Sequence, residues 1–201
     1  MSNIKKYWFT SDHHFSHANI IKYCNRPFKD VEEMNETMVA NWNSAVSDND
    51  IIYHLGDFAF EKDRTKLETL MSRLNGEKHI IWGNHDNVLK SVKWRDHFKT
   101  SSDLRTIVIP AESNNGVMQR IVLCHFAFLT WDQAHYDTIH LHGHSHGTLP
   151  DDPYARRLDV GVDCWNFTPV SMEQINEKMK EKLCRPKYHR QGNTENGSEA
   201  A

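Results

Sequence analysis

Long hydrophobic runs, a large excess of charge of one sign and closely spaced cysteines are all missing from this sequence of 201 residues. No apolar run approaches the length of a membrane span, and residues 1–6 do not begin a signal peptide. The formal net charge is only −3, which gives no strong bias toward nucleic acid or anionic membranes. We therefore expect a cytoplasmic protein without a membrane partner.

Cysteine is sparse, and its four positions, Cys24, Cys124, Cys164 and Cys184, are far apart. Because no two of them form a CxxC pair, the sequence indicates neither a zinc ribbon nor a thioredoxin-type site. We expect buried free thiols in a reduced compartment.

The overall composition is that of an ordinary globular protein, with 38% hydrophobic and 25% charged residues. The length favours one domain, which we place at residues 1–184. Residues 185–201 contain little apolar material, so they are predicted to form a disordered tail. Histidine is unusually frequent, with 14 copies, and it is a common metal ligand that titrates near neutral pH.

Hydrophobic periodicity predicts alternating strands and helices in the first half of the chain and mainly strands in the second. The expected strands are residues 4–10, 51–55, 79–82, 105–110, 118–124, 139–142 and 158–162. The expected helices are residues 31–46, 63–74, 88–98 and 171–183, the last opened by a capping box. This order predicts a layered α/β fold with a mixed sheet, whose site lies beyond the carboxyl ends of the strands.

Polar side chains of a few chemical kinds directly follow several of the predicted strands. In chain order they are Asp12 and His14; Asp57; Asn84, His85 and Asp86; His125; and His144 and His146. Gly56, Gly83 and Gly143 stand beside three of these groups. Glycine allows tight turns and lets backbone approach a site closely.

This mixture of donors favours a pair of metal ions. Aspartate can bridge two cations, neutral imidazole suits zinc, iron or manganese, and an asparagine oxygen adds a donor without charge. Two ions about 3.5–4 Å apart can hold a hydroxide between them and bind phosphoryl oxygens. A structural turn would explain the glycine of Gly83-Asn84-His85-Asp86 but not the polar residues after it. All the groups taken together therefore favour a metal site over a set of purely structural turns.

At these residues the sequence closely resembles the calcineurin-like metallophosphoesterase superfamily, and in particular its compact bacterial and phage-type members. The hallmark motifs DxH, GD, GNH(D/E), an isolated H and GHxH correspond to Asp12-His13-His14, Gly56-Asp57, Gly83-Asn84-His85-Asp86, His125 and Gly143-His144-Ser145-His146. The resemblance spans residues 4–175. It implies a four-layer α/β/β/α sandwich of two mixed sheets flanked by helices, which the strand pattern alone does not choose.

The resemblance also implies a role for each residue. One metal would be held by Asp12, His14 and His146, the other by Asn84, His125 and His144, with Asp57 bridging the two and His85 acting as general acid, oriented by Asp86. The implied cofactors are two divalent ions, with manganese expected and iron or zinc as alternatives. Many family members carry a second aspartate in the pattern GDxxD; this sequence has Phe60 there, which leaves one orienting contact in doubt.

Substrate contacts are predicted just behind the first ligands. Arg26 could bind a phosphate oxygen through two N–H groups, with a structural salt bridge as the alternative. His17 could contact the same phosphate or form a hydrogen bond at the start of a helix. Asp163 could brace the site or pack in the core, and His140 has no predicted role.

The expected function is that of a phosphoesterase with two metals, acting on a phosphorylated substrate. Because the chain is small and has no cap domain, we expect an open site, which favours a phosphodiesterase. A phosphomonoesterase, acting on small molecules or proteins, is the main alternative. A nuclease is less favoured because no long basic stripe is present, and a non-catalytic scaffold would be expected to have lost ligands. The identity of the substrate and the oligomeric state stay open.

Overall fold

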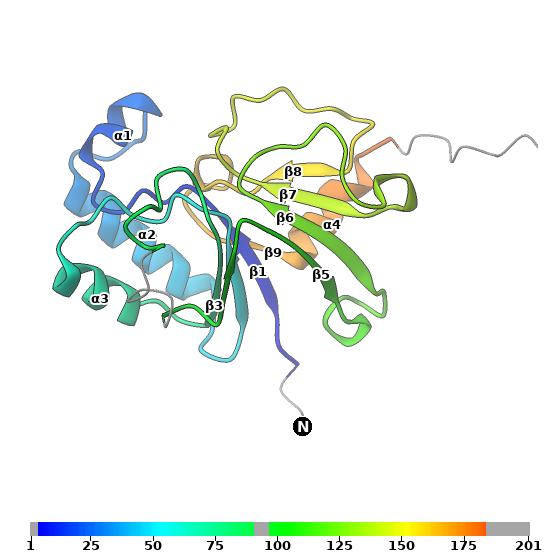
Figure 1. Ribbon diagram of the computed structural model, residues 1–201, viewed down its shortest axis with the longest axis horizontal. Coiled ribbons are helices and arrows are strands. Elements are labelled where there is room, and N and C mark those ends of the chain that lie inside the picture. Colours follow the sequence, from blue (N-terminus) through cyan, green and yellow to red (C-terminus); the bar gives the residue numbers. More distant parts are fainter. Residues whose placement is uncertain (1–3, 91–96, 184–201) are drawn as a thin grey trace, which may run out of the picture.

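The computed structural model describes residues 4–90 and 97–183 (Figure 1). The predicted tail at residues 185–201 and much of the predicted helix at 88–98 lie outside these ranges. Of that helix, residues 88–90 are described and belong to a run of turns, and residues 97–98 are described and lie just before the strand at 100–102. None of the helices in the described ranges is long and apolar enough to cross a membrane.

The first sheet contains five strands in the order β4-β3-β2-β1-β9. Their bounds are β1 Tyr7–Thr10, β2 Ile51–His54, β3 Glu77–Ile81, β4 Thr100–Ser102 and β9 Val170–Ser171. Strands β1 to β4 run parallel and β9 pairs antiparallel with β1, so the sheet is mixed. The carboxyl ends of β1, β2 and β3 therefore meet at one edge.

The second sheet contains four strands in the order β5-β6-β7-β8 (Figure 1). Their bounds are β5 Leu104–Ile109, β6 Gln119–Cys124, β7 Ile139–His142 and β8 Arg157–Asp159. Strand β5 is antiparallel to β6, whereas β6, β7 and β8 are parallel. A bridge between Ser11 and Gly161 joins the end of β1 to the chain just after β8, so the functional ends of the two sheets lie together.

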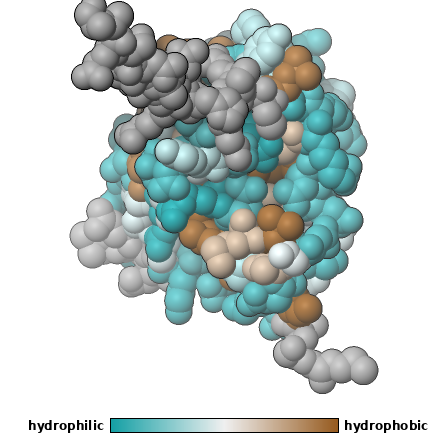
Figure 2. Space-filling model, turned by 90° about the vertical axis from the view of Figure 1, so that its right-hand side faces the viewer, coloured by the Kyte–Doolittle hydropathy of each residue, from teal (hydrophilic) through white to brown (hydrophobic). Residues whose placement is uncertain are grey.

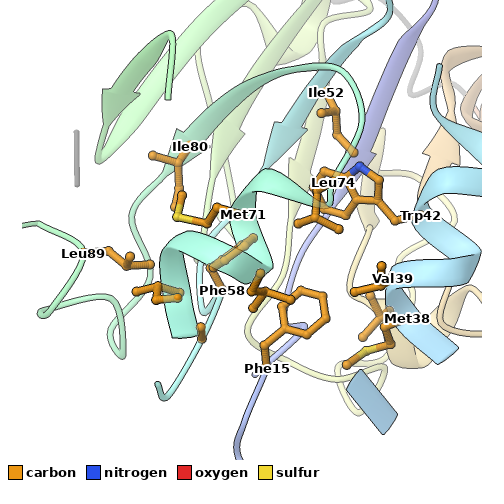
Figure 3. Close-up of a cluster of buried hydrophobic side chains, with 14 of the residues drawn as sticks. Phe15, Met38, Val39, Trp42, Ile52, Phe58, Met71, Leu74, Ile80 and Leu89 are labelled. Atoms are coloured by element: carbon orange, nitrogen blue, oxygen red, sulfur yellow. The ribbon is translucent and has the colours of Figure 1, made fainter. Parts of the chain in front are cut away.

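Helices cover the outer face of the first sheet and enclose one core. They are α1 Ala18–Tyr23, α2 Val31–Ala45 and α3 Arg64–Ser72. Asp30 caps α2 by accepting the Glu33 N–H at 2.8 Å, which satisfies a donor that the first helical turn leaves free. Figure 3 shows Trp42 of α2 and Met71 of α3 pointing into the buried cluster that also contains Phe58.

A second core lies between the two sheets. Phe9, Ile81, Ile121 and Leu141 are buried there, and they come from β1, β3, β6 and β7. Helix α4 Met172–Lys180 adds three buried apolar side chains to this core, and the predicted capping box at its start is confirmed. Two mixed sheets with flanking helices confirm the α/β sandwich fold class.

Several short elements differ from the sequence prediction. The first strand begins at Tyr7 instead of Ile4, and α1, β4 and β9 were not predicted. Each of these three contains at most six residues, which is too short for hydrophobic periodicity to show.

The described residues on the face shown in Figure 2 are mostly hydrophilic, with apolar side chains confined to small patches. Isolated apolar residues are normal on protein surfaces and require no explanation of their own.

Candidate metal centre and active site

The predicted ligands converge because the backbone binds their loops to one another. The N–H of Asp12 donates to the Gly56 carbonyl and that of His14 to the Asp57 carbonyl, both at 3.0 Å. On the second sheet, the Gly143 N–H donates to the His125 carbonyl at 3.0 Å. These bonds hold together loops that follow different strands, so side chains distant in sequence share one site.

One group of ligands consists of Asp12, His14 and His146, whose ligating atoms all lie within 4.8 Å of one another. The Oδ2 atom of Asp12 accepts the His144 backbone N–H at 2.9 Å. Its Oδ1 atom and both ring nitrogens of His14 are buried without a hydrogen-bond partner among the described residues. Unpaired buried polar atoms are costly, and a cation held here would satisfy the Asp12 oxygen and the unprotonated ring nitrogen of His14.

A second group consists of Asp57, His125 and His144, again with ligating atoms within 4.8 Å of one another. His125 Nδ1 lies 2.7 Å from the Leu55 carbonyl, so Nδ1 carries a proton and Nε2 is the nitrogen that faces the other members of the group. The same Nε2 lies 3.0 Å from Asn84 Oδ1, which places the predicted amide donor in this group.

Asp57 stands between the two groups. Its Oδ2 lies 3.6 Å from His14 Nε2 and 3.5 Å from His125 Nε2. Its Oδ1 accepts the His85 backbone N–H at 2.9 Å, which fixes the orientation of the carboxylate. One oxygen of Asp57 thus faces both ligand groups, and the structure brings all the predicted ligands together.

The backbone at these ligands is strained. Asp12, His14, Asp57, His144 and His146 have positive φ angles of 59°, 51°, 57°, 68° and 46°. The left-handed region costs a residue with a side chain about 1–2 kcal/mol, and such strain concentrates at functional sites. The surrounding hydrogen bonds therefore hold the ligands in conformations that the isolated chain disfavours.

Glycine is required here mainly because backbone segments approach one another closely. A Cβ atom on Gly83 would come within 2.5 Å of the Asp57 nitrogen and would collide with the Asp57 carboxylate. A Cβ atom on Gly143 would collide with Ser11 and Asp12. Any larger residue at either position would displace a predicted ligand.

The buried groups have strongly altered pKa values. Burial raises the pKa of Asp12 to about 7, so a nearby cation is needed to keep it fully charged at neutral pH. Burial also raises the pKa of Asp57, but the His125 side chain, the His85 N–H and the nearby His14 together bring it down to about 2. Burial lowers the pKa of His14 to about 2, which keeps the imidazole neutral, as a metal ligand must be.

His146 is oriented by a carboxylate outside the predicted set. Its Nδ1 lies 2.7 Å from Asp163 Oδ2, which leaves Nε2 to face the Asp12 group. Burial alone would raise the pKa of Asp163, but hydrogen bonds from His146 and Arg26 lower it and keep the carboxylate charged. The sequence allowed Asp163 either to brace the site or to pack in the core, and the structure shows that it braces the site.

Arg26 serves this same carboxylate. Its Nε and Nη2 donate to the two oxygens of Asp163, each at 2.8 Å. The other N–H groups donate to the carbonyls of Asp12 and His13, at 2.7 and 2.9 Å, and to the Met34 sulfur. The five N–H groups of the guanidinium thus all have protein partners, and the residue is only 4% exposed. The predicted phosphate contact of Arg26 does not fit this geometry, whereas the alternative of a structural salt bridge does.

Asp86 also differs from its predicted role. Its carboxylate accepts the backbone N–H groups of Asp57 and Phe58, both at 2.9 Å, and of Gly83 at 2.7 Å. The residue is 0% exposed, and its carboxylate lies among these backbone donors. Asp86 therefore holds the loops after β2 and β3 together instead of orienting the His85 ring.

His85 and His17 both contact the ring of Phe60. The rings of His17 and Phe60 stack with centroids 3.8 Å apart, and the His85 ring lies 4.9 Å from that of Phe60. The residue that replaces the second aspartate of the GDxxD pattern thus contacts the predicted general acid. His85 is exposed and its ring lies 5.6 Å from that of His14, so it borders the ligands while its imidazole remains accessible.

Comparison with known proteins agrees with this site. A family described as calcineurin-like phosphoesterase matches residues 5–179. The uncharacterized protein MJ1445 of Methanocaldococcus jannaschii is 37% identical over 179 residues, which covers 86% of this chain and 90% of that protein. The gene 66 protein of Mycobacterium phage L5 is 28% identical over 193 residues, with 84% and 91% covered.

One solved structure shares the fold. The protein of unknown function AQ665 from Aquifex aeolicus superimposes with a TM-score of 0.64 at 21% identity. The match covers 87% of this chain and 99% of that one.

Proposed function

The chain belongs to the calcineurin-like phosphoesterase family, and we propose that it hydrolyses phosphodiesters with the help of two divalent metal ions. The position of Asp57 carries this proposal. One of its oxygens lies 3.6 Å from a histidine nitrogen of the first ligand group and 3.5 Å from one of the second. A carboxylate shared in this way is the bridging ligand that a metal pair requires.

The donor set supports such a pair. Carboxylate, imidazole and amide donors suit manganese, iron or zinc, and we expect manganese. When bound, two ions supply positive charge to the phosphoryl oxygens and an activated water. The chain contributes imidazoles oriented by their hydrogen-bonded Nδ1 atoms, as at His125 and His146.

His85 is the proposed general acid. Its backbone N–H donates to Asp57 Oδ1, which anchors the residue to the site, while its exposed imidazole is free to move a proton. Protonation of the departing oxygen by a positioned side chain contributes about 10²–10⁴ to the rate.

The charge of the site favours a diester over a monoester. Arg26 is the cation that the sequence placed nearest the ligands, and it is fully engaged with Asp163 and with backbone carbonyls. It therefore cannot neutralise the second negative charge that a phosphomonoester carries near neutral pH. A diester carries a single charge and needs less compensation.

Metal-stripped protein reloaded with Mn²⁺, Fe²⁺ or Zn²⁺ tests the proposal. The substrates are bis(p-nitrophenyl) phosphate, p-nitrophenyl phosphate, cyclic nucleotides and short oligonucleotides, with Asp57→Asn as the control for metal-dependent turnover. We expect metal-dependent hydrolysis in which the synthetic diester has a higher kcat/KM than the monoester. A faster monoester would identify a phosphomonoesterase, and selective cleavage of the oligonucleotides a nuclease. No hydrolysis of any substrate would support the scaffold reading.

A further inference from the structure

Phe126 is an exposed aromatic ring that lies directly against the ligands of one metal group. Its side chain follows His125 in the sequence and is 44% exposed. The ring centroid lies 5.0 Å from that of His125 and 4.8 Å from that of His144, with interplanar angles of 75° and 67°. Phe126 belongs to neither of the buried clusters, so its exposed ring surface remains available beside the site.

His140 of β7 anchors the loop that carries Phe126. Nδ1 of His140 lies 3.1 Å from the Val122 carbonyl, and its Nε2 accepts the Phe128 N–H at 3.1 Å. The Phe128 ring stacks on His140 with centroids 4.9 Å apart and an interplanar angle of 10°. Phe128 thus packs on His140 of β7, whereas Phe126 is 44% exposed. The exposed ring of Phe126 therefore lies on a loop that His140 holds in place.

A different aromatic ring borders the other half of the site. Phe60 contacts His17 at a centroid distance of 3.8 Å, His85 at 4.9 Å and His14 at 5.5 Å. His14 belongs to the ligand group that does not contain His125 and His144. Because the leaving oxygen must lie within reach of His85, the leaving arm of the substrate belongs on the side of Phe60.

A phosphodiester has a second organic arm, which stays on the phosphorus after cleavage, whereas a monoester has none. We propose that Phe126 is a binding platform for this retained arm and selects phosphodiesters whose retained arm carries a planar ring. The proposal rests on the function proposed above and names its substrate class. An exposed phenyl ring offers a face or an edge to another ring, with centroids about 4.5–7 Å apart.

Two diesters with the same leaving group test the platform. Bis(p-nitrophenyl) phosphate and methyl p-nitrophenyl phosphate both release nitrophenolate and differ in the retained arm. Because Phe126→Ala removes the aromatic contact to the retained ring, we expect it to raise the KM of the two-ring substrate about tenfold more than that of the methyl ester. The values of kcat for the two-ring substrate should change little, because the retained arm binds equally well before and during the reaction. Phe126→Trp should restore the preference.

Leu129→Ala is the matched control, since Leu129 lies on the same loop and is 88% exposed. It should leave the ratio of the two KM values as in the wild type. Equal changes of KM for the two diesters in Phe126→Ala, or no change in either, would overturn the platform while leaving the proposed phosphodiesterase intact. Failure of the wild-type protein, loaded with metal, to hydrolyse either diester would instead overturn the proposed function itself.

Discussion

The carboxylate of Asp86 accepts the backbone N–H of Asp57 at 2.9 Å. The same carboxylate also accepts the N–H groups of Phe58 and Gly83, so one buried side chain joins the loop after β2 to the loop after β3. The position of the candidate bridging residue Asp57 therefore depends on Asp86, which is not itself a predicted ligand. Asp86 therefore has a structural role, which is distinct from the catalytic role proposed for its neighbour His85.

Asp86→Asn should destabilise the fold more than it alters the chemistry. An amide offers a single acceptor oxygen and places an NH₂ group against backbone donors, which we expect to lower the free energy of unfolding by about 2 kcal/mol. Urea unfolding of the metal-stripped protein measures this, with the exposed Asp132→Asn as control. If Asp86 oriented the His85 ring instead, the variant would retain its stability and lose rate selectively with poor leaving groups.

His85→Ala should retain metal and fold but lose rate. As general acid, His85 matters most when the leaving oxygen is basic, so the loss in kcat should be about 10²–10⁴ for an alkyl leaving group and much smaller for nitrophenolate. Comparison of methyl p-nitrophenyl phosphate with other methyl aryl and methyl alkyl phosphate diesters of increasing leaving-group pKa measures this dependence. Equal losses for all leaving groups would assign His85 to phosphoryl binding.

Asp163→Asn should weaken metal binding at one ligand group and not at the other. Asp163 orients His146 through a 2.7 Å hydrogen bond, and loss of such a partner typically costs about 10- to 100-fold in metal affinity. Calorimetric titration of metal-stripped protein with Mn²⁺ should show one weakened binding event and one event as in the wild type. Weakening of both events alike would mean that Asp163 supports the site as a whole.

His140 should make the fold sensitive to acid. Burial lowers its pKa from 6.5 to about 4, although its contact with the Val122 carbonyl favours the charged form. The unfolded chain therefore takes up a proton near pH 6.5, and the folded chain does so only near pH 4. The stabilising contribution is fully present above pH 6.5 and is lost as the pH falls through this window.

His140→Phe isolates this contribution, because it retains a ring for stacking and removes the titrating group. We expect its free energy of unfolding to decline less steeply than that of the wild type between pH 6.5 and 4, measured by urea unfolding. The loss of hydrogen bonds should lower stability by a constant amount at higher pH. Parallel curves for the two proteins would show that His140 does not titrate with this altered pKa.

The convergence of the candidate ligands could be predicted from the sequence, because metal-binding residue types stand at the ends of the predicted strands. Asp57, for example, follows a short apolar strand and a glycine, and parallel strands carry such positions to a common edge. The long helices α2 and α3 could also be predicted, since their apolar residues recur at helical spacing and aspartates cap them. These features are local in sequence.

The remaining features depend on contacts between distant segments. Arg26 and Asp163 are 137 positions apart, and nothing near Arg26 indicates that it is bound to a carboxylate instead of a phosphate. The sequence pairs Asp86 with its neighbour His85, although two of its three partners follow a different strand. The exposed ring of Phe126 could have been noticed as an aromatic residue directly after a ligand, but its contact with His144 appears only in the fold.

Binding of Mn²⁺ to metal-stripped wild-type protein and to Asp57→Asn tests the central claim, that one carboxylate serves two metals. The wild type should bind about two equivalents, and Asp57→Asn should lose affinity for both, because its Oδ2 position faces His14 and His125 alike. Exposed Asp132→Asn should bind as the wild type does. A single bound ion in the wild type, or an Asp57→Asn protein that retains one site at full affinity, would contradict the account.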